Sequence, residues 1–176
     1  CSRTESQAAN FLNDIKIESD QMDLIISRYV FEYLTDPVGV CKEFKRVLKK
    51  DGKVCLIDLD GVFANIYSGD KELDAMIEQL KLNVPALDMF VGRKMPSCLV
   101  EAGFKDVCWN ASIEVFKGKE LEAEIENNAQ RMKQAMPVID MLFGVRSEEF
   151  CERYLNAMRA PGATIFMNKF IVTGCK

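Results

Sequence analysis

Two short apolar runs separated by an amphipathic segment form the clearest pattern in this chain. Met22–Ser27 and Lys53–Leu59 are nearly continuous in hydrophobic residues, which is typical of strands covered on both faces in a parallel sheet. Between them, apolar residues recur at helical spacing after Asp36-Pro37, a capping residue followed by a first-turn proline. The stretch Asp23–Asp60 is therefore predicted as one βαβ unit, and the carboxyl ends of its strands are where such folds place ligands.

The rest of the chain alternates between two hydrophobic periods. Apolar residues at helical spacing predict helices, and alternation of apolar and polar residues predicts a long strand with one covered face. Pro137 is expected to end the helix that begins at Glu120, which leaves the apolar segment 138–144 as a lid or a partner surface. The expected elements are helices at 71–82, 95–102, 120–136 and 147–158 and strands at 107–115 and 164–173.

Length, composition and charge favour one ordinary globular domain. The chain has 176 residues, of which 48% are hydrophobic and 28% charged. A net charge of −4, without a basic run that contains aromatic residues, argues against nucleic acid as the main partner. No apolar run approaches the roughly 20 residues that span a bilayer, and no signal-peptide pattern is present. The sequence therefore predicts a cytoplasmic protein without a membrane partner.

The cysteine pattern and the lack of histidine narrow the possible chemistry. The seven cysteines contain no CxxC pair, so a metal site of the usual zinc spacing is not expected. Most of them lie within apolar patterns, as small core residues do in a reducing compartment. Without histidine, Ser-His and Cys-His nucleophile schemes are excluded. Acid–base chemistry would have to come from carboxylates, Tyr, Lys, Cys, the backbone or water.

Four segments taken in order resemble a known family. They read DLIISRYVFEYLTDP, EFKRVLKKDGKVCLIDLD, VGRKMPSCLVEAGFKDV and a terminal FIVTGCK. This order is similar to the second half of a class I S-adenosylmethionine-dependent methyltransferase of the small-molecule type. Met22-Asp23, Tyr33, Asp36-Pro37 and the run from Arg46 to Gly52 occupy that family's motif positions. Asp51, predicted to form a turn with Gly52, stands where the family has the first glycine of a Gly-Gly pair.

The resemblance implies an α/β fold with a Rossmann-like methyltransferase sheet. The family has seven strands, helices on both faces and a reversed, antiparallel last strand. By likeness, residues 9–12, 22–27 and 53–59 are its third, fourth and fifth strands, and 107–115 and 164–173 its sixth and seventh. We therefore expect residues 1–176 to form a single, partial methyltransferase domain, with a helical insertion at 117–163 before the last strand.

The family's cofactor loop has no counterpart in the sequence. No GxGxG motif is present, and eight residues precede the expected third strand, so the first two strands are expected to be missing. The chain would then be the carboxyl-terminal part of a larger enzyme, or its other half would be a separate chain. The expected fourth strand would also have a bare edge, which favours a homodimer or pairing with the missing amino-terminal half.

The resemblance also implies a set of site residues. Asp14 corresponds to the carboxylate that accepts a hydrogen bond from the adenine amino group, although an Asp at this position is also typical of a solvated turn. The loop after the expected fourth strand faces the cofactor, although its members also fit surface ion pairs and half-buried aromatics. The residues expected to bind S-adenosylmethionine are Asp14, Ile15, Ser27, Arg28, Tyr29 and Tyr33.

Catalytic and acceptor-binding residues are less defined. Asp58 and Asp60 end the expected fifth strand, where they would orient or deprotonate an acceptor, or remain solvated. Arg93 would bind an anionic acceptor or form an ion pair at the start of a helix. Met89 and Phe90, with residues 132–143, would line an acceptor site or pack in the core.

Three hypotheses on function follow from these patterns. In the first, the chain transfers a methyl group from S-adenosylmethionine to a small-molecule acceptor. In the second, it is a non-catalytic, methyltransferase-like module that acts in assembly or partner binding. In the third, it is a Rossmann-like domain that binds another nucleotide, which the βαβ unit alone supports.

Overall fold

The computed structural model describes residues 17–83, 87–163 and 165–176, and these form two compact units. The described part of the first unit contains residues 17–60, 87–112 and 168–176, and that of the second contains 61–83, 113–163 and 165–167. The expected strand at 9–12 lies outside the described residues. The predicted division into a methyltransferase part and a helical insertion stays a prediction.

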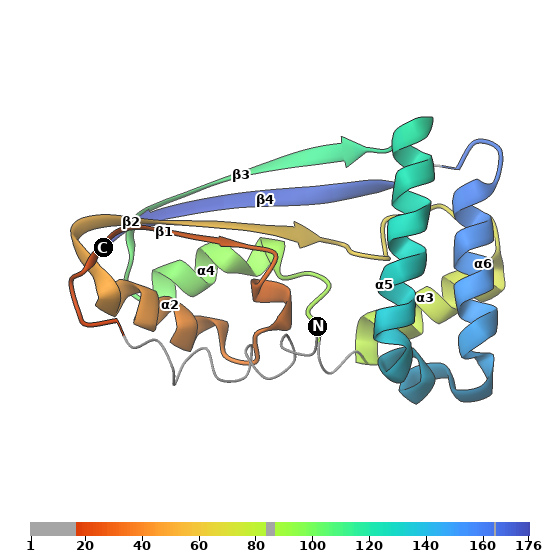
Figure 1. The fold of residues 1–176 in the computed structure, drawn as a ribbon, viewed down its shortest axis with the longest axis horizontal. Coiled ribbons are helices and arrows are strands. Elements are labelled where there is room, and N and C mark those ends of the chain that lie inside the picture. The colour runs from red at the N-terminus through yellow and green to blue at the C-terminus, as the bar shows by residue number, and fades with distance from the viewer. Residues whose placement is uncertain (1–16, 84–86, 164) are drawn as a thin grey trace. The chain divides into compact units, whose positions relative to one another are not determined.

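A mixed four-stranded sheet underlies the first unit. Its strands are β1 (Met22–Arg28), β2 (Leu48–Asp60), β3 (Lys105–Val115) and β4 (Phe166–Cys175). They lie in the order β1-β2-β4-β3 (Figure 1). β1 runs parallel to β2, whereas the last strand, β4, runs antiparallel to it. The predicted α/β fold with a reversed last strand is therefore confirmed.

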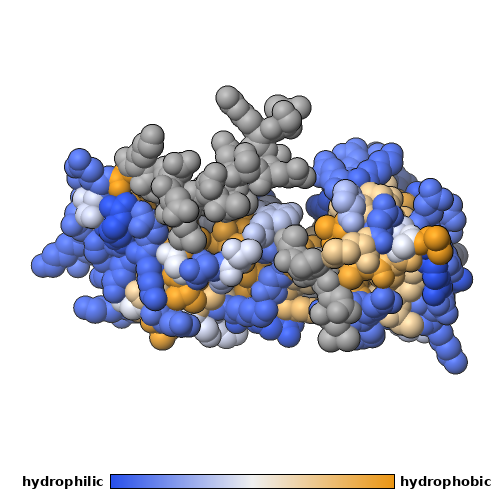
Figure 2. Space-filling model, turned by 90° about the horizontal axis from the view of Figure 1, so that it is seen from below, coloured by the Kyte–Doolittle hydropathy of each residue, from blue (hydrophilic) through white to orange (hydrophobic). Residues whose placement is uncertain are grey.

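Helix α2 (Pro37–Val47) connects the two parallel strands. The carboxylate of Asp36 accepts a hydrogen bond from the backbone N–H of Gly39 at 2.8 Å, as expected of an N-cap. The apolar stripe of α2 is buried, and its polar side contributes to the largely hydrophilic surface at that end of the unit (Figure 2). The predicted start and buried face of this helix are thus confirmed, whereas its end comes at Val47, and Lys49 and Lys50, which the pattern put in the last helical turn, belong to β2.

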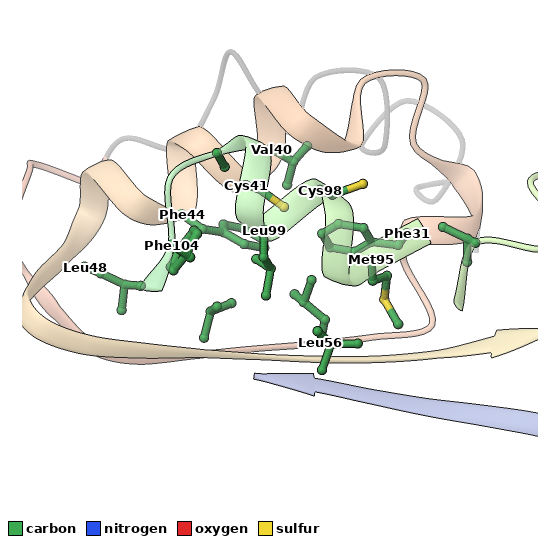
Figure 3. Packing of buried hydrophobic residues seen from close by; sticks show 14 residues of the cluster. Phe31, Val40, Cys41, Phe44, Leu48, Leu56, Met95, Cys98, Leu99 and Phe104 are labelled. Carbon is green, nitrogen blue, oxygen red and sulfur yellow. The ribbon is translucent and has the colours of Figure 1, made fainter. Parts of the chain in front are cut away.

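The core of this unit lies between β2 and two helices, α2 and α4 (Met95–Glu101) (Figure 3). Leu56 of β2 points toward these helices (Figure 3), and both Leu56 and Val54 have no exposed surface. Leu99 of α4 packs into the same cluster, and the Lys45 ammonium of α2 donates a hydrogen bond to the Gly103 carbonyl after α4. Side-chain burial on one face of β2 therefore joins the βαβ unit to α4.

Two local expectations about this strand pair differ from the structure, one about burial and one about a turn. Leu24 and Ile26 of β1 are 54% and 64% exposed, so β1 is not covered on both faces. A continuous apolar run does not reveal which face a helix covers. The turn expected at Asp51 is instead a bulge within β2, where the φ of Asp51 is +64°.

The second unit is mainly helical. It contains α3 (Lys71–Asn83), α5 (Lys119–Phe143), the short 3₁₀ helix η3 (Gly144–Arg146) and α6 (Ser147–Arg159). The expectation that Pro137 ends a helix is wrong, because α5 continues for six more residues to Phe143. An internal proline costs about 3 kcal/mol. Burial of Ile139 and stacking of Phe143 on Phe150, with ring centroids 4.8 Å apart, offset this cost.

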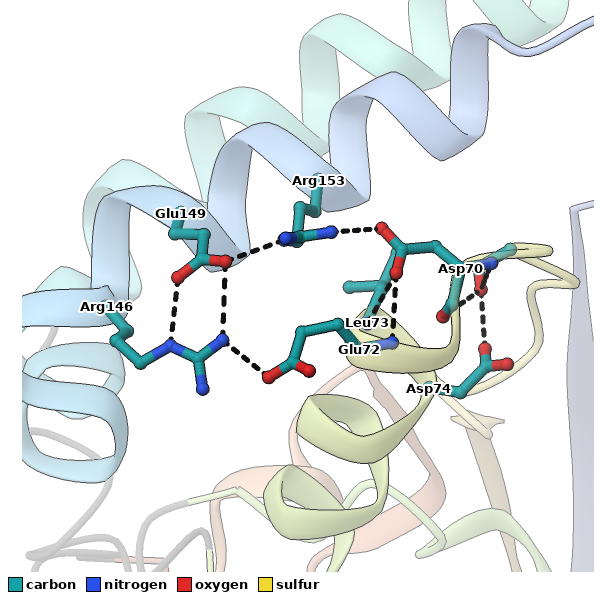
Figure 4. A network of polar contacts seen from close by, with 8 residues as sticks. Asp70, Glu72, Leu73, Asp74, Arg146, Glu149 and Arg153 are labelled. Carbon is teal, nitrogen blue, oxygen red and sulfur yellow. Dashed lines mark hydrogen bonds and ion pairs between the residues drawn. The ribbon is translucent and has the colours of Figure 1, made fainter.

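A chain of ion pairs connects α3 with α6 in this unit (Figure 4). The Arg146 guanidinium bridges Glu72 and Glu149 at 2.6 and 2.9 Å. Arg153 continues the chain by bridging Glu149 and Asp70 at 2.8 and 2.5 Å. These hydrogen bonds lower the pKa of Glu149 to about 2. The ionised carboxylate of Glu149 therefore favours the folded unit.

The described residues allow a comparison with two expectations, one about buried cysteines and one about membrane-spanning segments. Of the six cysteines among them, Cys41 and Cys98 are buried, and burial raises the pKa of the Cys41 thiol to about 12. The other four are partly or fully exposed, so core packing accounts for a minority of them. Within the described ranges, the helices are too short or too polar to span a membrane.

Leu99→Ala should destabilise the first unit by about 2–5 kcal/mol, because it leaves a cavity under β2. Val100→Ala is the matched control, since Val100 lies on the same helix and is 62% exposed. Urea unfolding followed by fluorescence of Trp109, which stacks on Phe170 in the first unit, measures both variants. Equal unfolding midpoints for the two variants would contradict the described core.

Glu149→Gln should lower the thermal unfolding midpoint at pH 7, and this difference from wild type should disappear in acid. Because the pKa of Glu149 is lowered from 4.5 to about 2 on folding, its contribution is present above pH 4.5 and disappears as the pH falls through about 2. Circular dichroism melts from pH 7 to pH 2 measure the difference from wild type. Glu152→Gln, an exposed change on the same helix, should show no such pH-dependent difference.

Candidate functional site

The candidate site is formed where β1 and β2 end side by side. Arg28, the last residue of β1, pairs with Ile57, three residues before the end of β2. The two strands are parallel, so their carboxyl ends lie at the same edge of the sheet, the usual position of ligands in α/β folds. The 3₁₀ helix η1 (Phe31–Tyr33) follows β1 directly. Two loops that are distant in sequence therefore meet at this edge.

Tyr29 makes the turn from β1 into η1. Its φ of +56° lies in the left-handed region that non-glycine residues rarely occupy. Its backbone N–H donates to the Ile57 carbonyl at 2.9 Å, which keeps the residue attached to β2. The Arg28 guanidinium lies over the Tyr29 ring, 4.6 Å from the ring centroid. The structure thus brings together two of the residues predicted to bind the cofactor.

Asp58 lies beneath this turn and is fully buried. One carboxylate oxygen accepts from the Phe31 backbone N–H at 2.9 Å, and the other accepts from that of Leu59 at 2.8 Å. Burial raises the pKa of Asp58, and hydrogen bonds from the backbone of Leu59, Phe31, Glu32 and Val30 oppose that rise. This arrangement favours an anchoring role for Asp58, and its predicted catalytic role stays a prediction.

Asp60 holds a second segment, η2 (Gly92–Lys94), which leads into α4. Its carboxylate accepts from the Arg93 backbone N–H at 3.0 Å and from the Arg93 guanidinium at distances down to 2.6 Å. Asp60 is 1% exposed, whereas the Arg93 side chain is 60% exposed and lies over the Phe90 ring. This is the ion pair that the sequence left as one alternative for Arg93, and hydrogen bonding to Asp60 raises the pKa of Arg93.

The other predicted residues differ in their surroundings. Ser27 is buried at the end of β1, whereas Tyr33 is 53% exposed on η1. Asp14 and Ile15 lie outside the described residues. Met89 is buried, which agrees with the core-packing alternative for this residue.

Sequence reasoning missed two acidic residues that tie the loops together. The Asp88 backbone N–H donates to the Glu32 carbonyl at 2.7 Å, and the Asp88 carboxylate binds the Lys94 ammonium at 2.6 Å. Glu32 itself is buried on η1. The sequence offered one signal for Asp88, because an Asp just before a turn often accepts hydrogen bonds from the turn. Nothing in the pattern of residues 29–34 marked Glu32 as inward-facing.

This edge combines an exposed aromatic ring with two carboxylates that the protein itself holds. Tyr33 offers an aromatic ring that is 53% exposed. Within the described ranges, no three His, Cys, Asp or Glu side chains are grouped as metal ligands. Asp58 and Asp60 already accept hydrogen bonds from the protein, so they maintain the shape of the edge.

The burial difference between Asp60 and Arg93 predicts unequal effects of their removal. Asp60→Asn leaves an exposed guanidinium that water can solvate, and should cost about 1–3 kcal/mol of stability. Arg93→Gln leaves a buried carboxylate without its cation and should cost more than Asp60→Asn. Urea unfolding of both single variants and the double variant measures the costs and their coupling. Additive effects, or a smaller cost for Arg93→Gln, would contradict this geometry.

Comparison with known proteins gives sequence and structural relatives. Residues 3–56 match the methyltransferase domain family. A protein of the fission yeast Schizosaccharomyces pombe, named an uncharacterized methyltransferase, is 29% identical over 83 residues, which is 47% of this chain. The chain covers 30% of the length of that yeast protein.

Two solved structures share the fold. One is described as a methyltransferase of an antibiotic biosynthesis pathway from Anabaena variabilis, with a TM-score of 0.54 and 13% identity over 92% of this chain and 70% of the other. The second is described as a methyltransferase from Bacillus halodurans, with a TM-score of 0.52 and 15% identity. The match covers 94% of this chain and 68% of the other. The matched segment 3–56 and this fold agree with the resemblance: part of the chain is similar to the methyltransferase domain family, and the fold is that of solved methyltransferases.

Proposed function

We propose that this chain is the carboxyl-terminal part of an enzyme that transfers a methyl group from S-adenosylmethionine to a small-molecule acceptor. The observation that carries the proposal is the pairing of the Arg28–Tyr33 loop with the end of β2 at one edge of the sheet. In this proposal the two loops supply one side of the cofactor site. The methyltransferase match of residues 3–56 and the methyltransferase fold support it.

The described residues have distinct roles in this proposal. Tyr33 stacks its exposed ring on the adenine, and the turn at Tyr29 places backbone groups beside the nucleoside. Asp58 and Asp60 fix the two loops, and Arg93 extends a cation toward an anionic group of the acceptor. The cofactor, when bound, supplies a methyl group already activated by a positive sulfur. The protein then contributes proximity and orientation, which are worth up to roughly 7–11 kcal/mol of the barrier.

Titration with S-adenosylhomocysteine, followed by NMR amide shifts, tests the proposal. We expect shifts at residues 27–33 and 58–60, and weaker binding by several-fold in Tyr33→Ala, because the stacking ring is lost. Tyr67→Ala is the control, because Tyr67 is 78% exposed and belongs to the second unit. No shifts up to millimolar ligand, or shifts confined to other residues, would overturn the proposed cofactor site.

A second proposal is a non-catalytic role in assembly, and the open side of β1 favours it. Leu24 and Ile26 are exposed on this strand, and within the described ranges β1 pairs with β2 alone. An edge strand with exposed apolar residues favours pairing with another chain, either a second copy or the amino-terminal half of the domain. Size-exclusion chromatography with light scattering tests for a dimer. Pairing between copies would be contradicted if the wild type is a monomer, or if Ile26→Lys has the same molar mass in solution as the wild type.

A further inference from the structure

The turn after β1 has a conformation that it would not keep by itself. A non-glycine residue in the left-handed region costs roughly 1–2 kcal/mol. Such residues persist where the surrounding structure holds them. Tyr29, with its φ of +56°, is at this position. The contacts that hold this turn therefore decide how the whole loop is presented.

The backbone after Tyr29 lies against one carboxylate. The Phe31 N–H donates to Asp58 at 2.9 Å, and the backbone of Val30 and Glu32 is near enough to help lower the pKa of Asp58. These amides begin a 3₁₀ helix, so they have no partners within it. A concave set of backbone N–H groups is an anion-binding nest. Here the anion is a side chain of the protein itself.

A carboxylate is the group that this position requires. Both oxygens of Asp58 accept hydrogen bonds, one from the loop and the other from Leu59 of its own strand. An amide would turn an NH₂ group toward backbone donors on one of these two sides. Asp58 is also fully buried, so water cannot replace a lost acceptor. The residue thus ties the loop to the end of β2.

The other side of the loop is held by a different segment. The Glu32 carbonyl accepts from the Asp88 backbone N–H at 2.7 Å. Glu32 therefore lies between an anchor on β2 and an anchor before η2. Tyr33, the next residue, carries the exposed ring. Movement of the η1 backbone would move this ring directly.

We propose that Asp58 is a positioning residue that fixes the strained backbone of residues 29–33, so that Tyr29 and Tyr33 are presented to the nucleoside of the cofactor. The ligand in this inference rests on the proposed function, whereas the anchoring of the loop does not. Asp58 acts through the loop and does not touch the reacting atoms. It is therefore distinct from the acid–base role that its position at a strand end suggests.

Asp58→Asn tests the anchor, with Asp60→Asn as a matched control. The control makes the same chemical change two residues along the same strand, where the carboxylate holds Arg93 instead of the loop. Hydrogen exchange of the backbone amides of residues 30–32 should accelerate roughly tenfold or more in Asp58→Asn. The same amides should remain within about threefold of wild type in Asp60→Asn. Equal exchange in both variants would overturn the proposal.

The pH dependence of the unmodified protein provides a second test that needs no variant to fold. The amide shifts of residues 30–32 should titrate together with the Asp58 carboxyl carbon, at a midpoint above 3.8, because burial raises the pKa of Asp58. The other charged groups near this strand end are Glu32 on η1, Asp60 on β2 and Arg93 on η2, and each is followed by its own side-chain signal. Amides that stay fixed while Asp58 titrates would overturn the anchor.

Cofactor binding separates this inference from the proposed function. If wild type binds S-adenosylhomocysteine and Asp58→Asn binds it at least several-fold more weakly, both proposals are supported. If Asp58→Asn binds as tightly as wild type although its loop exchanges faster, the positioning role is overturned and the proposed function stands. If wild type does not bind while the exchange and pH results hold, the proposed function fails and the anchor remains.

Discussion

Burial of one face of β2 beneath α2 and α4 is the interaction on which the first unit depends. Val54 and Leu56 are fully buried there, and Val172 of β4 joins them from the neighbouring strand. Because side chains alternate along a strand, this burial also decides the direction of Asp58 and Asp60. They follow on the same face, at the carboxyl end of the strand. The core therefore places two carboxylates under the loops at the strand ends.

Buried carboxylates at a strand end would ordinarily be costly. Here each is compensated by a different segment of the chain. Backbone N–H groups of the η1 loop surround Asp58, and Arg93 neutralises Asp60. The same contacts that lower the cost of burial also fix the loop conformations. Stability and shape of the candidate site thus have one physical origin, which explains why polar residues interrupt an otherwise apolar strand.

Sequence patterns were most informative for elements whose signals are local. The cap at Asp36 and the stripe of α2 predicted the start and the buried face of that helix, and β1 and β2 were also found from their apolar runs. Pro137 misled because tertiary packing of Ile139 and Phe143 outweighs its local cost. The sequence also pointed to the loop at Arg28 and Tyr29, and the binding role of these residues stays a prediction. The loop's links through Glu32 and Asp88 were missed because they join segments more than 50 residues apart.

The sequence by itself determined the class of fold and the order of its elements, because hydrophobic periodicity, caps and turns act over a few residues. It also carried the resemblance to a methyltransferase family, because four segments occur in that family's order. The tertiary structure alone decided which face of each strand is covered and what the carboxylates contact. Those properties depend on the register of β1 against β2 and on segments distant in sequence. For that reason Asp58, which the sequence offered as a catalytic candidate, is found in the fold as the support of a strained loop.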